Sequence, residues 1–263
     1  MKKILTIICG LLLITAVNAQ FTKSGGTLLR TGSSFMTAAT PPEEEEEVIP
    51  PSFLTSDGYT AAWYIAEEAN LTLDNDSVST WQDMTSNNRD LTQALEANRP
   101  VWNDGGYVTI AATTGLATDA FTFDQPCFYY AVIYQNTYTP SGYIFAPYTA
   151  TAIRIRQHPT SSSDFEVYAG TWWQPVEDDS QLGEWQLLRI LLNGANSRLV
   201  INGNSDNTGD VGATNPSGFR LGNYVGSNSA NVSFREIILR TGTESSENEA
   251  AIVEYLRDKY NLW

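Results

Sequence analysis

Aromatic side chains beside amide groups are the residues of this sequence best suited to bind a ligand. Trp172 and Trp173 precede Gln174, and Tyr138 and Tyr143 lie around the loop that follows the apolar segment CFYYAVIY. A sugar offers apolar C–H patches and a ring of hydroxyl groups, which aromatic faces next to polar groups match. Neighbouring side chains of an extended segment point to opposite faces, so one tryptophan is expected in the core and the other at the surface. These five residues are the predicted ligand-binding positions, with ordinary core packing as the alternative.

Few side chains are suited to catalysis. His158 is the single histidine, and Cys127 is the single cysteine after the N-terminal segment. This inventory excludes a zinc site built on several histidines and disfavours a histidine-dependent triad. His158 precedes a proline in a Thr/Ser-rich turn and is predicted at the surface, whereas Cys127 begins an apolar run and is predicted to be buried. The acidic residues 177–179 and Glu184 are interpreted as parts of a solvated loop.

A second acidic loop is the main candidate for a metal ion. Asn204, Asp206 and Thr208 alternate as in the first half of a calcium loop, but position twelve would be Asn215 rather than a bidentate glutamate. Such sequences are also typical of turns in which an Asx side chain bonds to its own backbone. No cofactor is therefore predicted, and calcium at these three side chains is the alternative left open.

The first nineteen residues have the pattern of an export signal. Lys2 and Lys3 precede an apolar stretch that ends in the small-residue sequence VNA before Gln20. Residues 1–19 are therefore predicted to be a signal peptide that is cleaved after Ala19. The apolar stretch is shorter than the roughly 20 residues of a membrane span. We expect an exported chain, periplasmic, secreted or at the cell surface, with no transmembrane segment in its mature form.

The composition is strongly acidic. The sequence has 30 Asp and Glu against 15 Lys and Arg, which gives a net charge of −15. Removal of the signal peptide takes away two lysines and no acid, so the mature chain is more negative still. This balance argues against nucleic acid or an anionic membrane surface as a partner. With one cysteine left, the mature chain forms no internal disulfide, and the hydrophobic core alone must stabilise it.

Composition divides the remaining chain into a linker and a domain. Residues 20–52 are rich in Gly, Ser and Thr and then carry PPEEEEEVIPP, which predicts a flexible, solvated linker. Residues 53–263 read as short strands between turn residues, which predicts an all-β domain. The expected strands are 59–65, 77–82, 99–102, 106–111, 116–123, 126–135, 142–147, 151–157, 163–169, 184–192, 196–202, 217–222 and 232–241.

The end of the chain contains the one predicted helix. Segment 232–241 is β-branched and aromatic and is expected to be a strand. Ser246 and Glu249 have the spacing of a capping box, so the helix is expected to start there. Apolar residues then recur at helical spacing and must pack on the rest of the domain: Ile252, Val253, Leu256 and Tyr260.

Two segments resemble the laminin-G-like, concanavalin A-like jelly rolls of secreted bacterial and phage proteins. In the first, the matching residues are Trp63, Leu71, Val78, Trp81, Asp83, Asn88, Thr92, Gln93, Arg99 and Pro100. In the second, they are FRLGN, FREIIL, Glu249, Ile252, Tyr255, Leu256, Lys259 and Tyr260. The resemblance implies a two-sheet antiparallel jelly-roll sandwich over residues 53–263 with one C-terminal α-helix. The residue types themselves predict that Asp83 bonds to backbone N–H groups of the turn at 85–89.

The expected function follows from this resemblance. Glycosidases and lyases occur on the same fold, but the strand motif Glu-x-Asp-x-x-Glu of its laminarinase-type members is absent from the sequence. The prediction is therefore an exported, non-catalytic recognition or adhesion module, not an enzyme, whose partner is a glycan or a surface protein. The first alternative is a structural or attachment protein, such as a cell-surface or phage-virion decoration. A carbohydrate-active enzyme on the same fold is a less favoured alternative.

Overall fold

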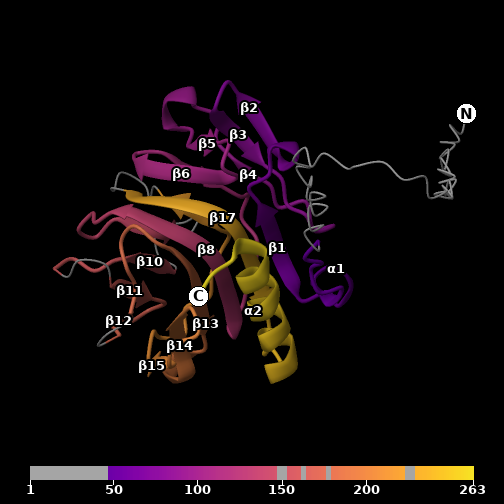
Figure 1. The fold of residues 1–263 in the computed structure, drawn as a ribbon. Coiled ribbons are helices and arrows are strands. Elements are labelled where there is room, and N and C mark those ends of the chain that lie inside the picture. The colour runs from indigo at the N-terminus through magenta and orange to yellow at the C-terminus, as the bar shows by residue number, and fades with distance from the viewer. Residues whose placement is uncertain (1–46, 147–152, 161–163, 176–178, 223–228) are drawn as a thin grey trace, which may run out of the picture. The chain divides into compact units, whose positions relative to one another are not determined.

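Strands make up nearly all the regular structure of the computed structural model, which describes residues 47–146, 153–160, 164–175, 179–222 and 229–263 (Figure 1). Within these ranges the strands are β1 Thr60–Ile65, β2 Leu71–Asp74, β3 Ser77–Trp81, β4 Leu91–Thr92, β5 Val101–Asn103, β6 Tyr107–Ala112, β7 Gly115–Ala117, β8 Cys127–Thr137, β9 Tyr143–Ala146, β10 Arg154–Gln157, β11 Phe165–Tyr168, β12 Trp172–Trp173, β13 Trp185–Leu192, β14 Ser197–Ile201, β15 Asn207–Gly209, β16 Arg220–Gly222 and β17 Ser229–Thr241. The helices are the four-residue α1 Phe53–Ser56 and the long α2 Ser246–Tyr260. The predicted all-β fold with a C-terminal helix is confirmed. The predicted signal peptide and most of the predicted linker lie outside the described residues.

The strand pairs close into a ring. Antiparallel pairs lead from β17 through β6, β5, β3, β4, β7 and β16 to β9, and one parallel pair, Ser229 with Tyr143, leads back to β17. The remaining strands extend this ring: β1 pairs with β17 and β2 with β3, β8, β13, β14 and β15 follow beyond β17, and β10, β11 and β12 follow beyond β9. This closure differs from an open two-sheet sandwich. The β-rich part of the predicted resemblance is confirmed, and the jelly-roll topology stays a prediction.

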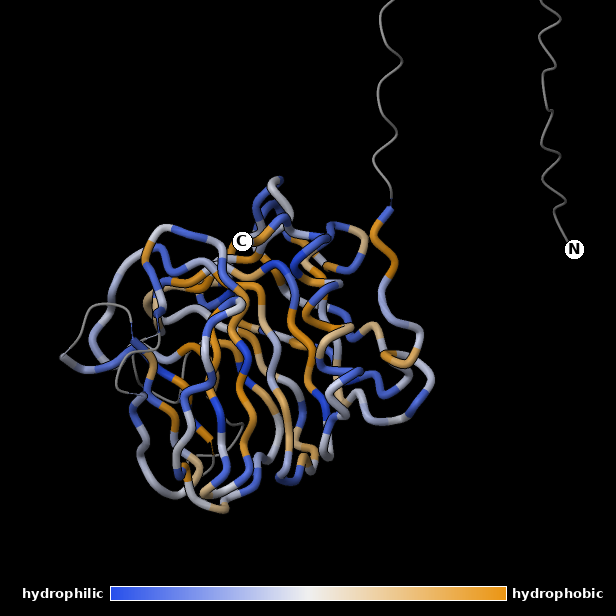
Figure 2. Tube along the Cα trace, turned by 60° about the horizontal axis from the view of Figure 1, so that its bottom comes forward, coloured by the Kyte–Doolittle hydropathy of each residue, from blue (hydrophilic) through white to orange (hydrophobic). Residues whose placement is uncertain are grey.

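The longest strand, β17, joins the parts of the ring because its neighbours change along its length. Its first half pairs with β6, and its second half pairs with β1. On its other side it pairs with β8 throughout. Residues 127, 129, 131 and 133 of β8 face the main core, whereas 128, 130 and 132 belong to a second cluster under α2. The predicted central strand, covered on both faces, is therefore confirmed (Figure 2).

Helix α2 packs on the outer face of β1, β8, β13 and β17. Ile252, Tyr255 and Leu256 are buried there, and Val253 and Tyr260 are partly buried. Burial of one such aliphatic side chain contributes about 1.5 to 3 kcal/mol. The capping box prediction is wrong by one residue, because the N-cap is Ser245, whose side chain accepts from the Asn248 N–H at 3.1 Å.

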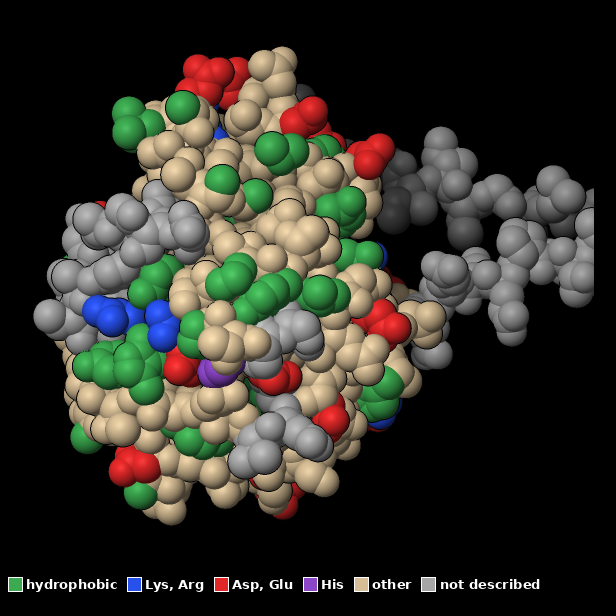
Figure 3. Space-filling model, turned by 90° about the vertical axis from the view of Figure 1, so that its left-hand side faces the viewer, with side chains coloured by type: hydrophobic (Ala, Val, Ile, Leu, Met, Phe, Trp, Pro, Cys, Tyr) green, Lys and Arg blue, Asp and Glu red, His purple; other side chains and the backbone are tan. Residues whose placement is uncertain are grey.

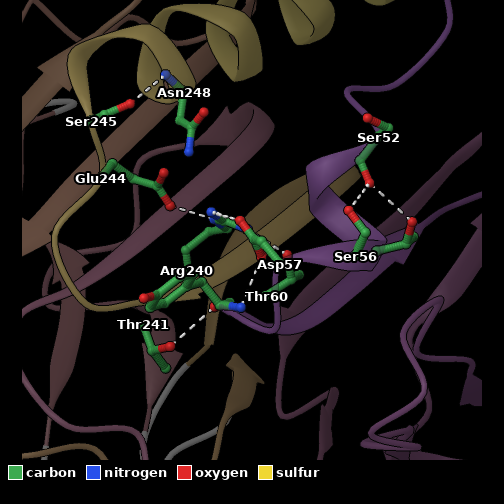
Figure 4. A network of polar contacts seen from close by, with 11 residues as sticks. Ser52, Ser56, Asp57, Thr60, Arg240, Thr241, Glu244, Ser245 and Asn248 are labelled. Carbon is green, nitrogen blue, oxygen red and sulfur yellow. Dashed lines mark hydrogen bonds and ion pairs between the residues drawn. The ribbon is translucent and has the colours of Figure 1, made fainter.

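A buried arginine links both ends of the domain (Figure 4). Arg240, at the end of β17, is 1% exposed and donates to Asp57 at 2.8 Å and to Thr60 at 2.8 Å. It also forms an ion pair with Glu244 just before α2. Burial of the Asp57 carboxyl raises its pKa, but the hydrogen bonds from Arg240 and from the Tyr59 N–H outweigh this effect, so the pKa is lowered. A charged Asp57 therefore stabilises the fold.

We predict that Asp57→Asn destabilises the protein by about 1 to 3 kcal/mol at pH 7, because it weakens charge-assisted bonds to a buried arginine. The folded-state pKa of Asp57 lies below the unfolded one, so this contribution is present above the ordinary carboxyl pKa and is lost as pH falls through the folded value. Urea unfolding of wild type and variant at pH 7 and about pH 3 measures it. An equal difference at both pH values would contradict the prediction.

Candidate functional site

A β-bulge in β17 puts two charged residues side by side on the outer face of the sheet. The register against β8 shifts between Phe234 and Glu236, so Arg235 has no partner residue on that strand. Phe234 and Ile237 face the main core, whereas Glu236 faces α2. The shift occurs where the other neighbour of β17 changes from β6 to β1. Bulges re-aim side chains in this way.

All the hydrogen-bond partners of the Glu236 side chain lie on the face of the sheet that α2 covers. Its fully buried carboxylate accepts from the Trp63 indole at 2.7 Å, the Tyr255 hydroxyl at 3.2 Å, the Tyr260 hydroxyl at 2.7 Å and the Lys259 ammonium at 2.9 Å. Burial, and then the Glu236 charge, raise the pKa of Tyr255 and of Tyr260, so both hydroxyls stay protonated donors. This carboxylate holds the C-terminal half of α2 to β1 and β17.

Arg235 lies between two aromatic rings. Its guanidinium carbon is 4.2 Å from the centre of the Trp185 ring and 5.6 Å from that of Tyr260. Burial of the guanidinium lowers its pKa, but an arginine stays charged in any protein environment. Within the described residues we find no ion pair or hydrogen bond of this guanidinium. Its neighbour Lys259, by contrast, is neutralised by Glu236 at 2.9 Å.

Two surface hollows are linked by the contact between Arg235 and Trp185, because Trp185 lines the first and Arg235 lines the second, and we call them together the Arg235 groove. The first, of about 320 Å³, is lined by Tyr107, Tyr134, Asn136, Trp185 and Ser233. The second, of about 290 Å³, is lined by Ile65, Ala66, Glu67, Gly105, Gly106, Arg235, Lys259 and Tyr260. The residues of the first hollow come from β6, β17, β8 and β13, which lie side by side (Figure 1).

The rings and polar groups of the first hollow are held by one another. The Trp185 ring centre is 5.5 Å from that of Tyr107 and 5.3 Å from that of Tyr134. The Asn136 amide donates to the Ser233 hydroxyl at 3.0 Å, and that hydroxyl lies 2.8 Å from the Thr109 hydroxyl. The groove therefore presents three aromatic rings, an amide, hydroxyls and a cation on one face.

The predicted ligand-binding residues line neither hollow, and the two tryptophans form β12 at the end of the run of strands β9, β10, β11 and β12. Trp172 is 36% exposed, and its ring lies 3.9 Å from the Arg156 guanidinium carbon and 5.0 Å from the Tyr168 ring. Trp173 packs against the main core, as the alternation predicts, and Gln174 is exposed. Figure 3 shows cations beside hydrophobic side chains on this face, near the single histidine.

The two predicted tyrosines do not join that tryptophan site. Tyr143 is buried, and the Tyr138 hydroxyl donates to the His158 carbonyl at 2.8 Å. His158 follows the end of β10 that pairs with Phe165, whereas Trp172 pairs with Tyr168 beside the other end. The prediction that His158 lies at the surface is wrong, because the residue is 8% exposed and its Nδ1 accepts from the Thr160 N–H at 3.2 Å.

Other predicted positions have structural partners. The Asp83 carboxylate accepts from the Trp63, Thr85 and Arg89 N–H groups, which confirms its predicted role in the turn. Cys127 is buried, as predicted. Asp206 forms an ion pair with Arg198 at 2.8 Å.

The remaining acidic candidates do not gather into a site in the described residues. Asn204 and Thr208 are exposed beside Asp206, and the ranges that the structure describes contain no cluster of three acidic, histidine or cysteine side chains fit for a metal ion. Glu184 is exposed, and Glu177 and Asp178 lie outside those ranges.

Comparison with solved structures relates this fold to carbohydrate-active proteins. Domain 4 of an extracellular GH43 arabinanase from Geobacillus stearothermophilus, in complex with arabinotriose, matches with a TM-score of 0.55 at 13% identity over 75% of this chain and 98% of that one. Trypanosoma rangeli sialidase matches at 0.52 and 12% over 74% of this chain and 32% of that one. An arabinofuranosidase in complex with arabinofuranosyl-α-1,2-xylobiose matches with a TM-score of 0.53 at 16% identity, over 70% of this chain and 51% of that one.

The chain thus spans about a third of the sialidase and half of the arabinofuranosidase. At these identities the likeness shows the fold. Protein-family models give no match, and neither do curated proteins. None of the helices in the described ranges is long and apolar enough to cross a membrane.

These comparisons contradict the predicted non-catalytic recognition or adhesion module and the prediction that the protein is not an enzyme. The similar structures are glycosidases or domains of glycosidases. The prediction that the protein is not an enzyme depended on the absence of the motif Glu-x-Asp-x-x-Glu, which places its carboxylates on one strand. A fold can also bring catalytic groups together from separate strands and loops, and a motif within one strand does not detect these.

We predict that Glu236→Gln lowers stability by about 3 to 5 kcal/mol, because it leaves the partly buried Lys259 ammonium without its buried counter-charge. Urea unfolding measures the loss. Glu254→Gln on the exposed side of the same helix is the control and should change stability by less than about 0.5 kcal/mol. Equal effects of the two substitutions would show that Glu236 does not anchor α2.

Proposed function

We propose that the protein is a carbohydrate-active enzyme of the glycoside hydrolase type, or a domain of one, and that it binds a saccharide chain in the Arg235 groove. The observation that carries this proposal is the Trp185 ring packed against the rings of Tyr107 and Tyr134, a set that comes from three of four adjacent strands. Aromatic faces can pack against the C–H patches of a sugar, and the hydroxyl and amide groups beside them can bond to its hydroxyls. The fold shared with glycosidases supports it.

Glu67 is the acid that we assign to the groove. It is the one carboxylate among the residues that line the two hollows, and its side chain is 61% exposed. Lys259 lies 3.8 Å from it and also contacts Glu236, so the position of Glu67 is linked to the helix. Glycoside hydrolysis needs a proton donor at the leaving oxygen and, in most families, a second carboxylate. The exposed Glu184, next to Trp185, is the second candidate.

We predict that the protein releases reducing ends from a polysaccharide or an aryl glycoside, and that Glu67→Gln lowers this rate at least about a hundredfold, as loss of an acid catalyst does. Trp185→Ala should raise KM by about tenfold, because one stacking surface is lost. Reducing-end assays over a panel of plant, algal and bacterial polysaccharides measure both effects.

Two matched variants separate this site from others. Glu254→Gln removes an exposed carboxylate far from the groove, and Trp172→Ala removes the exposed tryptophan of β12. Both should keep wild-type rates. No release from any substrate, or equal losses in Glu67→Gln and Glu254→Gln, would refute the proposal. Loss in Trp172→Ala alone would move saccharide binding to the site predicted at Trp172, Trp173 and Gln174.

We also propose that the chain is exported, with residues 1–19 as its signal peptide, and that the ring of strands is a variant of the laminin-G-like jelly roll. The Lys-rich start and small-residue cleavage sequence support export. Expression of the full chain in a bacterial host, followed by N-terminal sequencing of the protein outside the cytoplasm, should give Gln20 as the first residue. An uncleaved Met1 chain in the cytoplasm would refute it.

A further inference from the structure

We propose that the Arg235 groove selects an acidic saccharide and that Arg235 binds its carboxylate. This inference rests on the proposed function and adds the substrate class. The observation behind it is a charged guanidinium that lines the groove and has two aromatic rings as its neighbours, but no carboxylate within ion-pair distance in the described part of the chain.

The lack of a counter-charge sets Arg235 apart in an acidic protein. The chain has twice as many acidic as basic residues, and its other arginines near α2 are paired. Arg189 and Arg198 both bind Glu249, and Arg240 binds Asp57 and Glu244. Glu236 follows Arg235 in sequence on the same face, but its oxygens already accept from Lys259 and from tyrosine and tryptophan donors.

The rings hold the guanidinium in place without using its hydrogen-bond donors. An arginine stacked on an aromatic face keeps its planar set of N–H groups free at the edge, and this set matches a carboxylate through two parallel bonds. The Trp185 ring lies 4.2 Å from the guanidinium carbon, and the bulge sets the backbone position of Arg235. Little rotational freedom is then lost when a ligand binds.

The rest of the groove fits a sugar ring attached to such a carboxylate. Tyr107 and Tyr134 offer apolar faces on either side of Trp185, and Asn136 and Ser233 offer polar groups one strand away. A simple anion would use the cation alone. An acidic sugar uses the cation, the rings and the polar groups together, and for this reason we assign a saccharide rather than a free inorganic anion.

Binding of matched ligands tests the proposal. The probes are trisaccharides of galacturonic, glucuronic and mannuronic acid, sialyllactose, and the carboxyl-reduced form of each, titrated calorimetrically into the full chain. Wild type should bind at least one acid about tenfold or more tightly than its reduced form, and the difference should shrink with added salt. Arg235→Gln should remove the preference and leave affinity for the reduced form unchanged. Arg235→Lys should recover only part of it, because an ammonium binds as a point charge.

Controls make a negative result informative. Arg257→Gln removes an exposed arginine that is paired with Asp258 outside the groove, and it should bind like wild type. Melting temperatures of all variants should agree within a few degrees. If the acid and its reduced form bound with equal affinity, and Trp185→Ala abolished the binding of both, the acidic substrate class would be refuted while saccharide binding in the groove would stand. No binding of any saccharide would overturn both proposals, and preference for sulfated over carboxylated sugars would overturn the carboxylate assignment.

Discussion

The single extra residue at the bulge of β17 is the constraint on which the site and the helix both depend. A regular strand would send Arg235 and Glu236 to opposite faces. The shift in register places both on the outer face, so one strand supplies a carboxylate to the helix and a cation to the groove. It falls where β17 changes neighbours from β6 to β1, a place where pairing must be interrupted in any case. The change of neighbour along β17 and the construction of the site therefore occur at the same place in the strand.

The division of partners between these two charges explains why the cation remains available. Two neighbouring opposite charges would ordinarily pair. Here Glu236 is fully buried and has enough donors from Trp63, Lys259 and Tyr260 for both oxygens. A buried carboxylate needs such a set, because its desolvation costs several kcal/mol, on the order of what its partners return. The Tyr260 ring then covers Arg235 from the helix side. The end of α2 is in this way both scaffold and wall of the groove.

Much of the fold can be predicted from the sequence, because the pattern of apolar and polar residues within a strand reflects which of its faces are buried. Each of the thirteen predicted strands overlaps a strand of the structure, and the four strands that were not predicted are short: β2, β4, β12 and β15. The capping box failed because Glu249, which would close it, instead binds Arg189 and Arg198 on strands that lie far away in sequence. No local pattern reports such partners.

The groove was missed for the same reason. Trp185 and Tyr134 belong to apolar segments that predict core positions, yet both are only partly buried and line the first hollow. Segment FREIIL places two polar residues, Arg235 and Glu236, side by side between apolar ones, and this break in the alternation is the one sequence signal of the bulge. The Trp172 prediction used adjacent aromatic residues as its evidence, and adjacency along the chain selects opposite faces of a strand rather than one surface. Rings that form one surface come from neighbouring strands, which only the pairing register brings together.

The charge of the whole protein sets how a cation in the groove acts on a ligand. A chain of net charge −15 repels an anion at long range. At physiological ionic strength this repulsion is screened beyond about 8 Å, whereas a stacked guanidinium at contact is screened far less. Such a site contributes little to the association rate and mainly slows dissociation of the bound ligand, because its attraction acts only after the sugar lies on the rings. In this protein, discrimination between sugars depends on the aromatic floor and the cation together, and neither group replaces the other.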